Sequence, residues 1–284
     1  MYPPNFDYYR AGSLDEAVAL LSQHKGAKVL AGGHSLLPAM KLRLSAPPAL
    51  IDISKVAGLS GITANGGSVS IGATTPHAVI AASDDVPAAL SEAAGNIGDQ
   101  QVRNRGTIGG NVANADPASD LPTVLLALGA TFHILGPKGQ RAVAADEFFK
   151  GLFETALADG EILTSIEVPA EGKGSGSAYA KLDHPASRYA LVGAAISVSV
   201  SGGKFTAVRA AIGGLTESAT RLKSVEEALA GNPAGDDALY AAAEATPSDL
   251  GIVMGDAHAS SDYRKAMAPV FVRRALASAV ARAG

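Results

Sequence analysis

The segment from Arg103 to Asp120, RNRGTIGGNVANADPASD, constrains the fold more than any other part of the chain. It has no long apolar run, no helical period and no clean alternation, so neither an amphipathic helix nor a half-buried strand is predicted there. Gly106, Gly109 and Gly110 let the backbone turn where side chains would clash and bring its N–H groups close to a ligand. We therefore expect a ligand-binding loop that the rest of the fold supports.

A second glycine loop, AGGHS at Ala31–Ser35, has the same character. The apolar run at 28–31 predicts a buried strand before it, and the pattern at 35–43 predicts a helix after it. Backbone N–H groups between a strand and a helix suit a phosphate. The loop has neither the G-x-G-x-x-G of a dinucleotide fold nor the Gly-Lys-Ser/Thr of a P-loop. Taken alone, this loop could equally be a phosphate-binding loop or a tight turn with a structural role only. Two such loops in one chain, however, predict that an anion-rich small molecule is bound.

Composition narrows the class of protein. A chain of 284 residues with 47% hydrophobic and 18% charged residues can bury the core of one large domain or of two to three smaller ones. The net charge of −4 leaves no basic excess for a nucleic acid. The absence of cysteine excludes disulfides, a cysteine nucleophile, thiolate zinc and an iron–sulfur cluster held by this chain. The six histidines are scattered without HExxH, so no metal site is expected.

The hydropathy pattern bears on location. The N-terminal MYPPNFDYYR has no apolar stretch typical of a signal peptide, and no window approaches 18 uninterrupted apolar residues. We expect a cytoplasmic protein. Whether it lies at the inner face of the membrane as part of a complex stays open.

Local patterns predict a mixed order of helices and strands. Ser13 and Glu16 have the spacing of a capping box before an apolar helical stripe. Strands are expected at 28–31, 49–53, 62–73 (a hairpin), 130–135, 141–144 and 161–168, and helices at 35–43, 75–82, 86–94 and from Ser119-Asp120 onward. The Gly/Ser-rich connector AEGKGSGS at 170–177 is typical of a domain boundary. After it, three strands (177–182, 190–200, 204–212) and three helices (224–230, 236–244, 263–283) predict a small α+β domain.

Five motifs carry a resemblance to a known family. They are AGGHSLLPAMKLR at Ala31–Arg43, IGATT at Ile71–Thr75, TIGGNVANADPASD at Thr107–Asp120, EILTSIEVP at Glu161–Pro169 and AIGGL at Ala211–Leu215. With them the chain resembles the FAD-binding medium subunit of the molybdenum hydroxylases, the family of carbon monoxide dehydrogenase and xanthine dehydrogenase. The motifs follow one another in the expected order along nearly the whole chain.

The resemblance implies an α+β fold in two parts. The first, 1–173, would be an FAD-binding domain of the vanillyl-alcohol-oxidase or PCMH type, with subdomains of about 1–55 and 56–173. The second, 177–284, would be a C-terminal domain of the CO dehydrogenase flavoprotein type, with a three-stranded antiparallel sheet and helices.

The resemblance also assigns cofactor-binding residues. The first loop would wrap the FAD pyrophosphate, the second would complete that cradle, and the residues after it would face the ribityl and flavin side. FAD is expected to be non-covalent, so His34 would donate a hydrogen bond in the pyrophosphate loop. The residues implied are Val29, Leu30, Ala31, Gly32, Gly33, His34, Ser35 and Leu36, then Thr107, Ile108, Gly109, Gly110 and Asn111, and finally Ala113, Asn114, Asp116 and Asp120.

Four further residues are implied near the flavin ring, and each has a plainer interpretation or an open one. Lys181 would place a cation beside the reduced ring, but an exposed strand lysine is equally ordinary. Leu163 would lie near the ring or simply be a core leucine. For Asp120, already named above, the plainer interpretation is a helix cap. Tyr189 corresponds loosely to an aromatic that covers one flavin face. Ile97 stands where the family residue can be aromatic, which leaves the other face unassigned.

The implied function is electron transfer without a catalytic acid or base in this chain. A large subunit would carry the molybdopterin cofactor, and a small subunit two 2Fe–2S clusters, in a dimer of heterotrimers. FAD here would pass electrons to an external acceptor, namely a quinone, a cytochrome or NAD. Two alternatives stay open: a stand-alone flavin oxidase of the vanillyl-alcohol-oxidase type, and a scaffold that has lost its flavin. The substrate is not encoded in this subunit.

Overall fold

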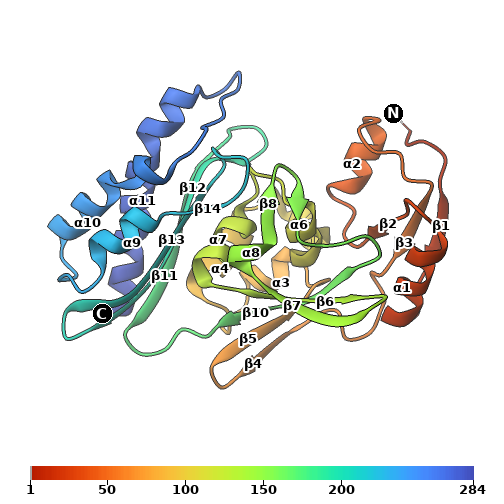
Figure 1. The fold of residues 1–284 in the computed structure, drawn as a ribbon, viewed down its shortest axis with the longest axis horizontal. Helices are drawn as coiled ribbons and strands as arrows, with labels where there is room; N and C mark the ends of the chain where they lie inside the picture. Colours follow the sequence, from red (N-terminus) through yellow and green to blue (C-terminus); the bar gives the residue numbers. More distant parts are fainter. Residues whose placement is uncertain (1) are drawn as a thin grey trace.

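The computed structural model describes residues 2–284, and its N-terminal part is a small parallel sheet with two helices. Strands β1 (Asp7–Arg10), β3 (Ala49–Asp52) and β2 (Lys28–Leu30) lie in the order β1-β3-β2, and α1 (Leu14–Gln23) and α2 (Leu36–Lys41) connect them. At the start of α1, Ser13 Oγ accepts from the Glu16 N–H at 3.1 Å, whereas the Glu16 carboxylate accepts from the Gly12 N–H at 2.7 Å. This part lies at one end of the molecule (Figure 1).

The middle part is a five-stranded antiparallel sheet covered by helices. Its order is β4 (Ile62–Asn65), β5 (Ser68–Gly72), β10 (Ile162–Pro169), β6 (Thr131–Gly136) and β7 (Gly139–Ala144). The helices are α3 (His77–Ala81), α4 (Ala88–Gly95), α5 (Gln100–Arg105), α6 (Ile108–Asn114), α7 (Asp120–Leu128) and α8 (Ala145–Phe148). A two-stranded ribbon, β8 (Phe149–Gly151) with β9 (Glu154–Thr155), follows α8.

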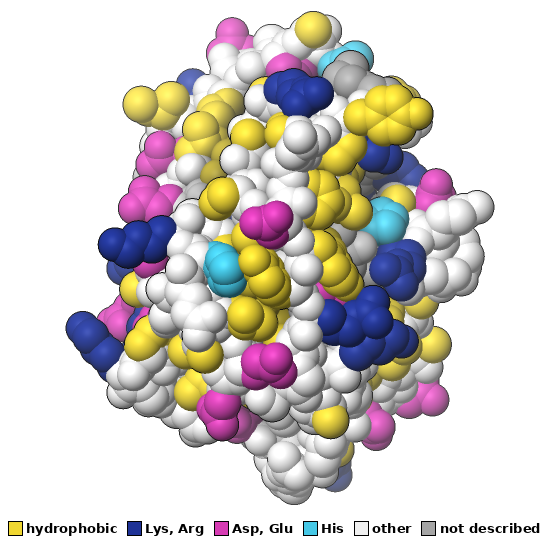
Figure 2. Space-filling view, turned by 90° about the vertical axis from the view of Figure 1, so that its right-hand side faces the viewer, with side chains coloured by type: hydrophobic (Ala, Val, Ile, Leu, Met, Phe, Trp, Pro, Cys, Tyr) yellow, Lys and Arg dark blue, Asp and Glu magenta, His cyan; other side chains and the backbone are white. Residues whose placement is uncertain are grey.

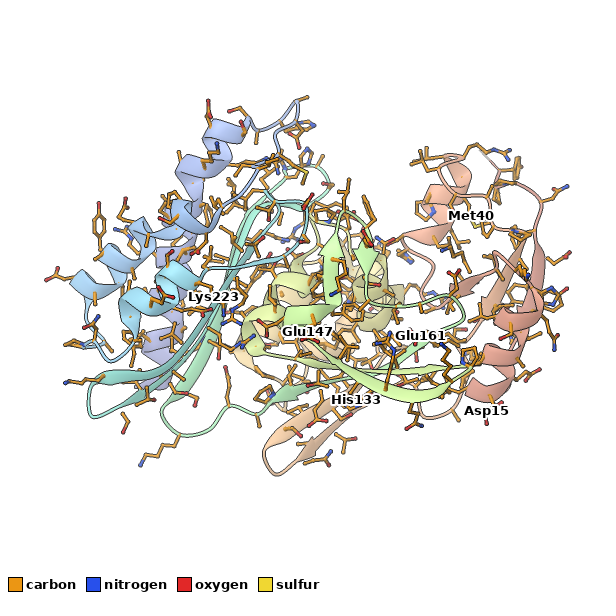
Figure 3. The ribbon with its side chains drawn as sticks, viewed as in Figure 1. Asp15, Met40, His133, Glu147, Glu161 and Lys223 are labelled. Atoms are coloured by element: carbon orange, nitrogen blue, oxygen red, sulfur yellow. The ribbon has the colours of Figure 1, made fainter. Side chains whose placement is uncertain are left out.

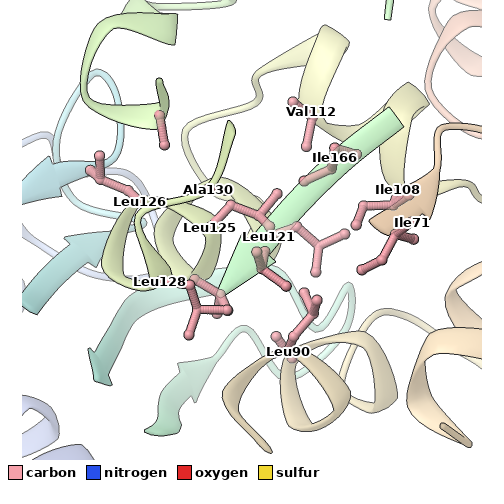
Figure 4. Close-up of a cluster of buried hydrophobic side chains, with 14 of the residues drawn as sticks. Ile71, Leu90, Ile108, Val112, Leu121, Leu125, Leu126, Leu128, Ala130 and Ile166 are labelled. Carbon is pink, nitrogen blue, oxygen red and sulfur yellow. The ribbon is translucent and has the colours of Figure 1, made fainter. Parts of the chain in front are cut away.

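Helix α7 is the centre of the main core. Its sequence DLPTVLLAL is apolar on every side, and each of its nine residues is buried, as expected of a helix enclosed by other elements. Leu121 and Leu125 lie in one cluster with Ile166 of the sheet and Leu90 of α4 (Figure 4). Burial of each such side chain contributes about 1.5–3 kcal/mol.

The C-terminal part is an antiparallel sheet with helices on one face. Its strands are β11 (Ser175–Asp183), β12 (Ala190–Ser201), β13 (Lys204–Gly213) and the short β14 (Thr220–Arg221). Helices α9 (Lys223–Leu229), α10 (Asp236–Glu244) and α11 (Ser261–Ala283), with a 3₁₀ turn at Thr246–Asp249, share a second core with this sheet. Because Tyr179, Ala195 and Ala211 belong to the main core, the other face of the sheet packs against α4 and α7 (Figure 1).

The α+β fold expected from the sequence is confirmed, with three differences. The segment after Gly106 is not an irregular loop: Thr107 caps α6, whose first turn contains Gly109 and Gly110. The C-terminal sheet gains β14 as a fourth strand. The connector is also shorter than predicted, because β11 already begins at Ser175. Within residues 2–284 no helix is long and apolar enough to cross a membrane.

Candidate functional site

A cavity of about 760 Å³ lies between the N-terminal part and the middle part of the fold. Both glycine segments line it, and its far wall is formed by residues 153–163. Figure 3 labels Glu161, which belongs to that wall. Figure 2 shows the molecule from the N-terminal end, where apolar, acidic and basic side chains all reach the surface. The volume is in the range of sites for small molecules and cofactors.

The first glycine loop presents free backbone donors to this cavity. Within residues 2–284, no acceptor is recorded for the backbone N–H groups of Gly32, Gly33, His34 and Ser35. Gly33 has φ +76°, which L side chains rarely adopt. His34 is exposed, with its Nδ1 3.1 Å from the Gly32 carbonyl oxygen. Consecutive unpartnered N–H groups at a cavity form an anion-binding concavity.

The second glycine segment differs, because its N–H groups are already used. Ile108 donates to Thr75 O at 3.1 Å, Gly109 to Ala73 O at 2.8 Å, and Gly110 to Thr107 Oγ1 at 3.2 Å. A Cβ on Gly109 would stand 2.5 Å from the Cβ of Ala73. The expectation that both loops offer amide donors is therefore wrong for Ile108, Gly109 and Gly110. This segment shapes the cavity, and Gly110 stays open toward it.

The two glycine segments touch through backbone atoms. A Cβ on Gly32 would lie 2.1 Å from the carbonyl oxygen of Arg105. The residues Ala73, Thr74 and His77, which support the second segment, also line the cavity. The site therefore has a third wall from the turn after β5.

Most residues expected at the site line this cavity. They are Val29, Leu30, Ala31, Gly32, Gly33, His34, Ser35, Leu36, Ile97, Thr107, Gly109, Gly110, Asn111, Ala113, Asn114, Asp120, Leu163 and Tyr189. Ile108, Asp116 and Lys181 are not in its lining. Ile108 is fully buried in the main core, so its side chain packs the fold.

Lys181 lies behind the cavity in a buried polar network. Its ammonium donates to Asp120 Oδ2 at 3.1 Å, to Asn96 O at 3.0 Å and to Arg188 O at 2.7 Å. Because an ammonium has three donors, none is left for another acceptor. The plainer interpretation, an exposed strand lysine, is wrong, since the side chain is 4% exposed.

Asp120 is the carboxylate of this network. It accepts from Tyr179 Oη at 2.6 Å, and burial raises its pKa although Lys181 and Tyr179 act in the opposite direction. Asp120 is not a helix cap: Ser119 occupies the N-cap position of α7, and its hydroxyl donates to Asn111 Oδ1 at 2.7 Å. The network therefore fixes the loop that ends in Arg188 against α7.

Tyr189 and Leu163 lie at the cavity in different ways. Tyr189 is 45% exposed, and its pKa is raised by partial burial and by the charges of Asp116 and Asp120. Leu163 is 5% exposed and belongs to the main core, so it is a core leucine that also lines the cavity. Its position near a flavin ring stays a prediction.

Sequence reasoning missed two parts of the site. One is the wall around Phe153 to Gly160, which has no local pattern and is fixed by an ion pair of Arg141 with Glu161 at 2.6 Å. The other is His77, two residues beyond the IGATT motif, which could have been found by extending that motif. In the described part of the chain, no group of three acidic or histidine side chains could hold a metal.

The residues of the cavity fit a dinucleotide such as FAD. The unpartnered N–H groups at Gly32 to Ser35 suit a diphosphate, and the open Cα of Gly110 leaves room beside it. Its lining includes Leu30 of the N-terminal part and Tyr189 of the loop between β11 and β12, so residues from all three parts of the fold surround it.

Two family models match the chain, one to its first part and one to its second. The model of the FAD binding domain in molybdopterin dehydrogenase matches residues 4–171, and that of the CO dehydrogenase flavoprotein C-terminal domain matches residues 177–279. The carbon monoxide dehydrogenase medium chain of Hydrogenophaga pseudoflava is 42% identical, with 99% of each chain covered. The glyceraldehyde dehydrogenase medium chain of Sulfolobus acidocaldarius is 38% identical, with 97% and 98% covered.

A solved structure is similar as well. The carbon monoxide dehydrogenase from Hydrogenophaga pseudoflava, in a form that lacks the Mo-pyranopterin moiety, has a chain that matches with a TM-score of 0.95, 43% identity and 99% of each chain covered. Such matches extend over the whole chain rather than over one motif. The chain therefore belongs to the FAD-binding medium-chain family of the molybdopterin dehydrogenases.

Proposed function

We propose that this cavity binds FAD non-covalently, with the diphosphate held by the first glycine loop. The observation that carries the proposal is the run of backbone N–H groups from Gly32 to Ser35 that have no acceptor among the described residues. His34 lies beside them as a further donor, and the second glycine segment closes the other side. The flavin end lies toward Asp120 and Tyr189.

The chain is then the FAD-carrying electron-transfer subunit of a molybdenum hydroxylase. Bound FAD supplies a group that takes up electrons one at a time and delivers them to an acceptor. The protein positions that group: the Asp120, Lys181 and Tyr179 network holds the loop that bears Tyr189 in place. No acid–base residue is required of this chain.

The partners belong to the same proposal. Electrons come from 2Fe–2S clusters in a small subunit, and a large subunit holds the molybdenum cofactor, in a dimer of heterotrimers in the cytoplasm. The final acceptor is a quinone, a cytochrome or NAD. Because similar medium chains serve carbon monoxide dehydrogenase and glyceraldehyde dehydrogenase, the substrate is chosen outside this subunit.

The stand-alone oxidase is less well supported. Medium chains of multi-subunit enzymes match this chain over nearly its full length, including the C-terminal domain. This match is expected of a subunit that has no substrate domain of its own, and not of a stand-alone oxidase. Co-purification with a large and a small partner chain is the expected result.

The experiment that tests the site is Gly110→Val. The new side chain would meet Thr107 Oγ1, 2.9 Å from the position of its Cβ, and would otherwise point into the cavity. We expect FAD, released by acid and measured by absorbance, to fall from one per chain to near zero. The control is Gly172→Val, because a Cβ at Gly172 meets nothing within 4 Å. If Gly110→Val keeps its full FAD content, the proposal that FAD binds in this cavity is refuted.

A further inference from the structure

His77 is held at the junction of the two glycine segments. It is the first residue of α3, and its backbone N–H donates to Gly106 O at 3.0 Å, next to a bridge between Pro76 and Thr107. A Cβ on Gly106 would lie 2.9 Å from Nε2 of the His77 ring. The ring therefore packs directly on the backbone where the second segment begins.

Among residues 2–284, no hydrogen bond is recorded for either nitrogen of the His77 ring. The side chain is 3% exposed, yet Nδ1 has no partner. It is the one buried side-chain nitrogen or oxygen in residues 2–284 left in that state. Buried polar groups are nearly always hydrogen-bonded, so a ring that leaves Nδ1 unpaired is costly to keep. Nε2, the other ring nitrogen, is not enclosed in this way, and no partner is recorded for it among the described residues.

The ring is also uncharged and faces the cavity. Burial, with the neighbouring His34 as a second cause, lowers the pKa of His77 to about 4. A neutral imidazole has one N–H donor and one acceptor. Since buried N–H groups without a partner are rarer than unpaired acceptors, the proton belongs on Nε2 and Nδ1 remains the unpaired acceptor. His77 is in the cavity lining, close to the loop that contains His34.

We infer that His77 is a cofactor-contacting residue, whose Nε2–H donates a hydrogen bond to the diphosphate bound by the first glycine loop. This rests on the proposed FAD site. A neutral donor at this point adds to the backbone amides of the first glycine loop. It also explains why an imidazole occupies a position that an apolar side chain would fill without an unpaired nitrogen.

The test compares two substitutions in the assembly as purified with its partners. After removal of the flavin, FAD rebinding is titrated for the wild type, His77→Leu and His77→Gln. Leucine fills the space without a donor, whereas the glutamine amide keeps a neutral donor. We expect about 10- to 150-fold weaker binding for His77→Leu, the order expected of one hydrogen bond to a charged group, and near-normal binding for His77→Gln.

Competition separates hydrogen bonding from packing. ADP carries the diphosphate and riboflavin does not. The inhibition constant of ADP should therefore rise by about 10- to 150-fold in His77→Leu, while that of riboflavin stays unchanged. Equal FAD affinity in all three proteins, equal losses in both variants, or equal effects on ADP and riboflavin would each overturn the inference. Gly110→Val is run alongside: if it too binds FAD normally, the FAD site itself is refuted rather than the role of His77 alone.

Discussion

The most direct test of the contact between the two glycine segments is Gly32→Ala, which adds a single methyl group. The Cβ would lie 2.1 Å from the carbonyl oxygen of Arg105 and 3.0 Å from the Cα of Gly106. Both contacts are to backbone, so no flexible side chain can turn away. Ordinary contact begins at 3.4 Å, and the two glycine segments must therefore separate by about 1.3 Å.

The magnitude follows from that displacement. Overpacking of a well-packed contact costs about 1–3 kcal/mol, which we expect as a loss in the free energy of unfolding of the flavin-free protein. The larger effect falls on FAD, since the N–H groups of Gly33 to Ser35 move with the loop. A hydrogen bond to a charged group contributes roughly 1.5–3 kcal/mol, so loss of one weakens binding by about 10- to 150-fold.

The assay measures FAD per chain and the dissociation constant of FAD from the reconstituted assembly. Gly172→Ala is the matched control, because a methyl at Gly172 meets nothing within 4 Å and its φ is unrestricted. If Gly32→Ala binds FAD as tightly as this control, the close approach of the two segments is not what builds the site, and the reasoning is refuted.

Two further predictions concern buried groups. The pKa of His77 falls from 6.5 to about 4 on folding. Between these two pH values the unfolded chain therefore binds more protons than the folded one, so the free energy of unfolding that is present above pH 6.5 decreases as the pH falls. The decrease is about 3 kcal/mol. Urea unfolding from pH 7 to pH 4 should show this loss in the wild type and not in His77→Gln, and parallel curves for the two would contradict it. Lys181→Met should destabilise the protein by about 3–5 kcal/mol, because it leaves the buried Asp120 carboxylate without its cation. A second substitution, Asp120→Asn, should recover part of that loss in chemical denaturation, whereas additive losses would show that the two groups act independently.

The sequence alone predicted most of the longer elements, but not β1, α5, α6 or the short strands β8, β9 and β14. Apolar periodicity and turn residues act over a few neighbouring positions, so β2, β10 and α11 begin and end within a few residues of the predicted bounds. The motifs at Ala31–Ser35 and Thr107–Asn111 likewise marked two sides of one cavity. The segment containing Gly109 was misjudged as a loop because glycine lowers helix propensity, while its bonds to Ala73 and Thr75 hold α6 in place.

The tertiary structure decided which groups remain free and which are used. Lys181 and Asp120 are 61 positions apart, and only the packing of the C-terminal sheet against α4 and α7 shows that the lysine is buried with its donors consumed. The same holds for His77, whose ring meets Gly106 across the turn after β5. Hydrogen-bond partners and burial are set by contacts between distant segments, on which local patterns carry no information. The sequence by itself therefore determined which two glycine segments meet at one cavity. The fold determined that, among the described residues, the N–H groups of the first segment have no partner while those of the second are already used.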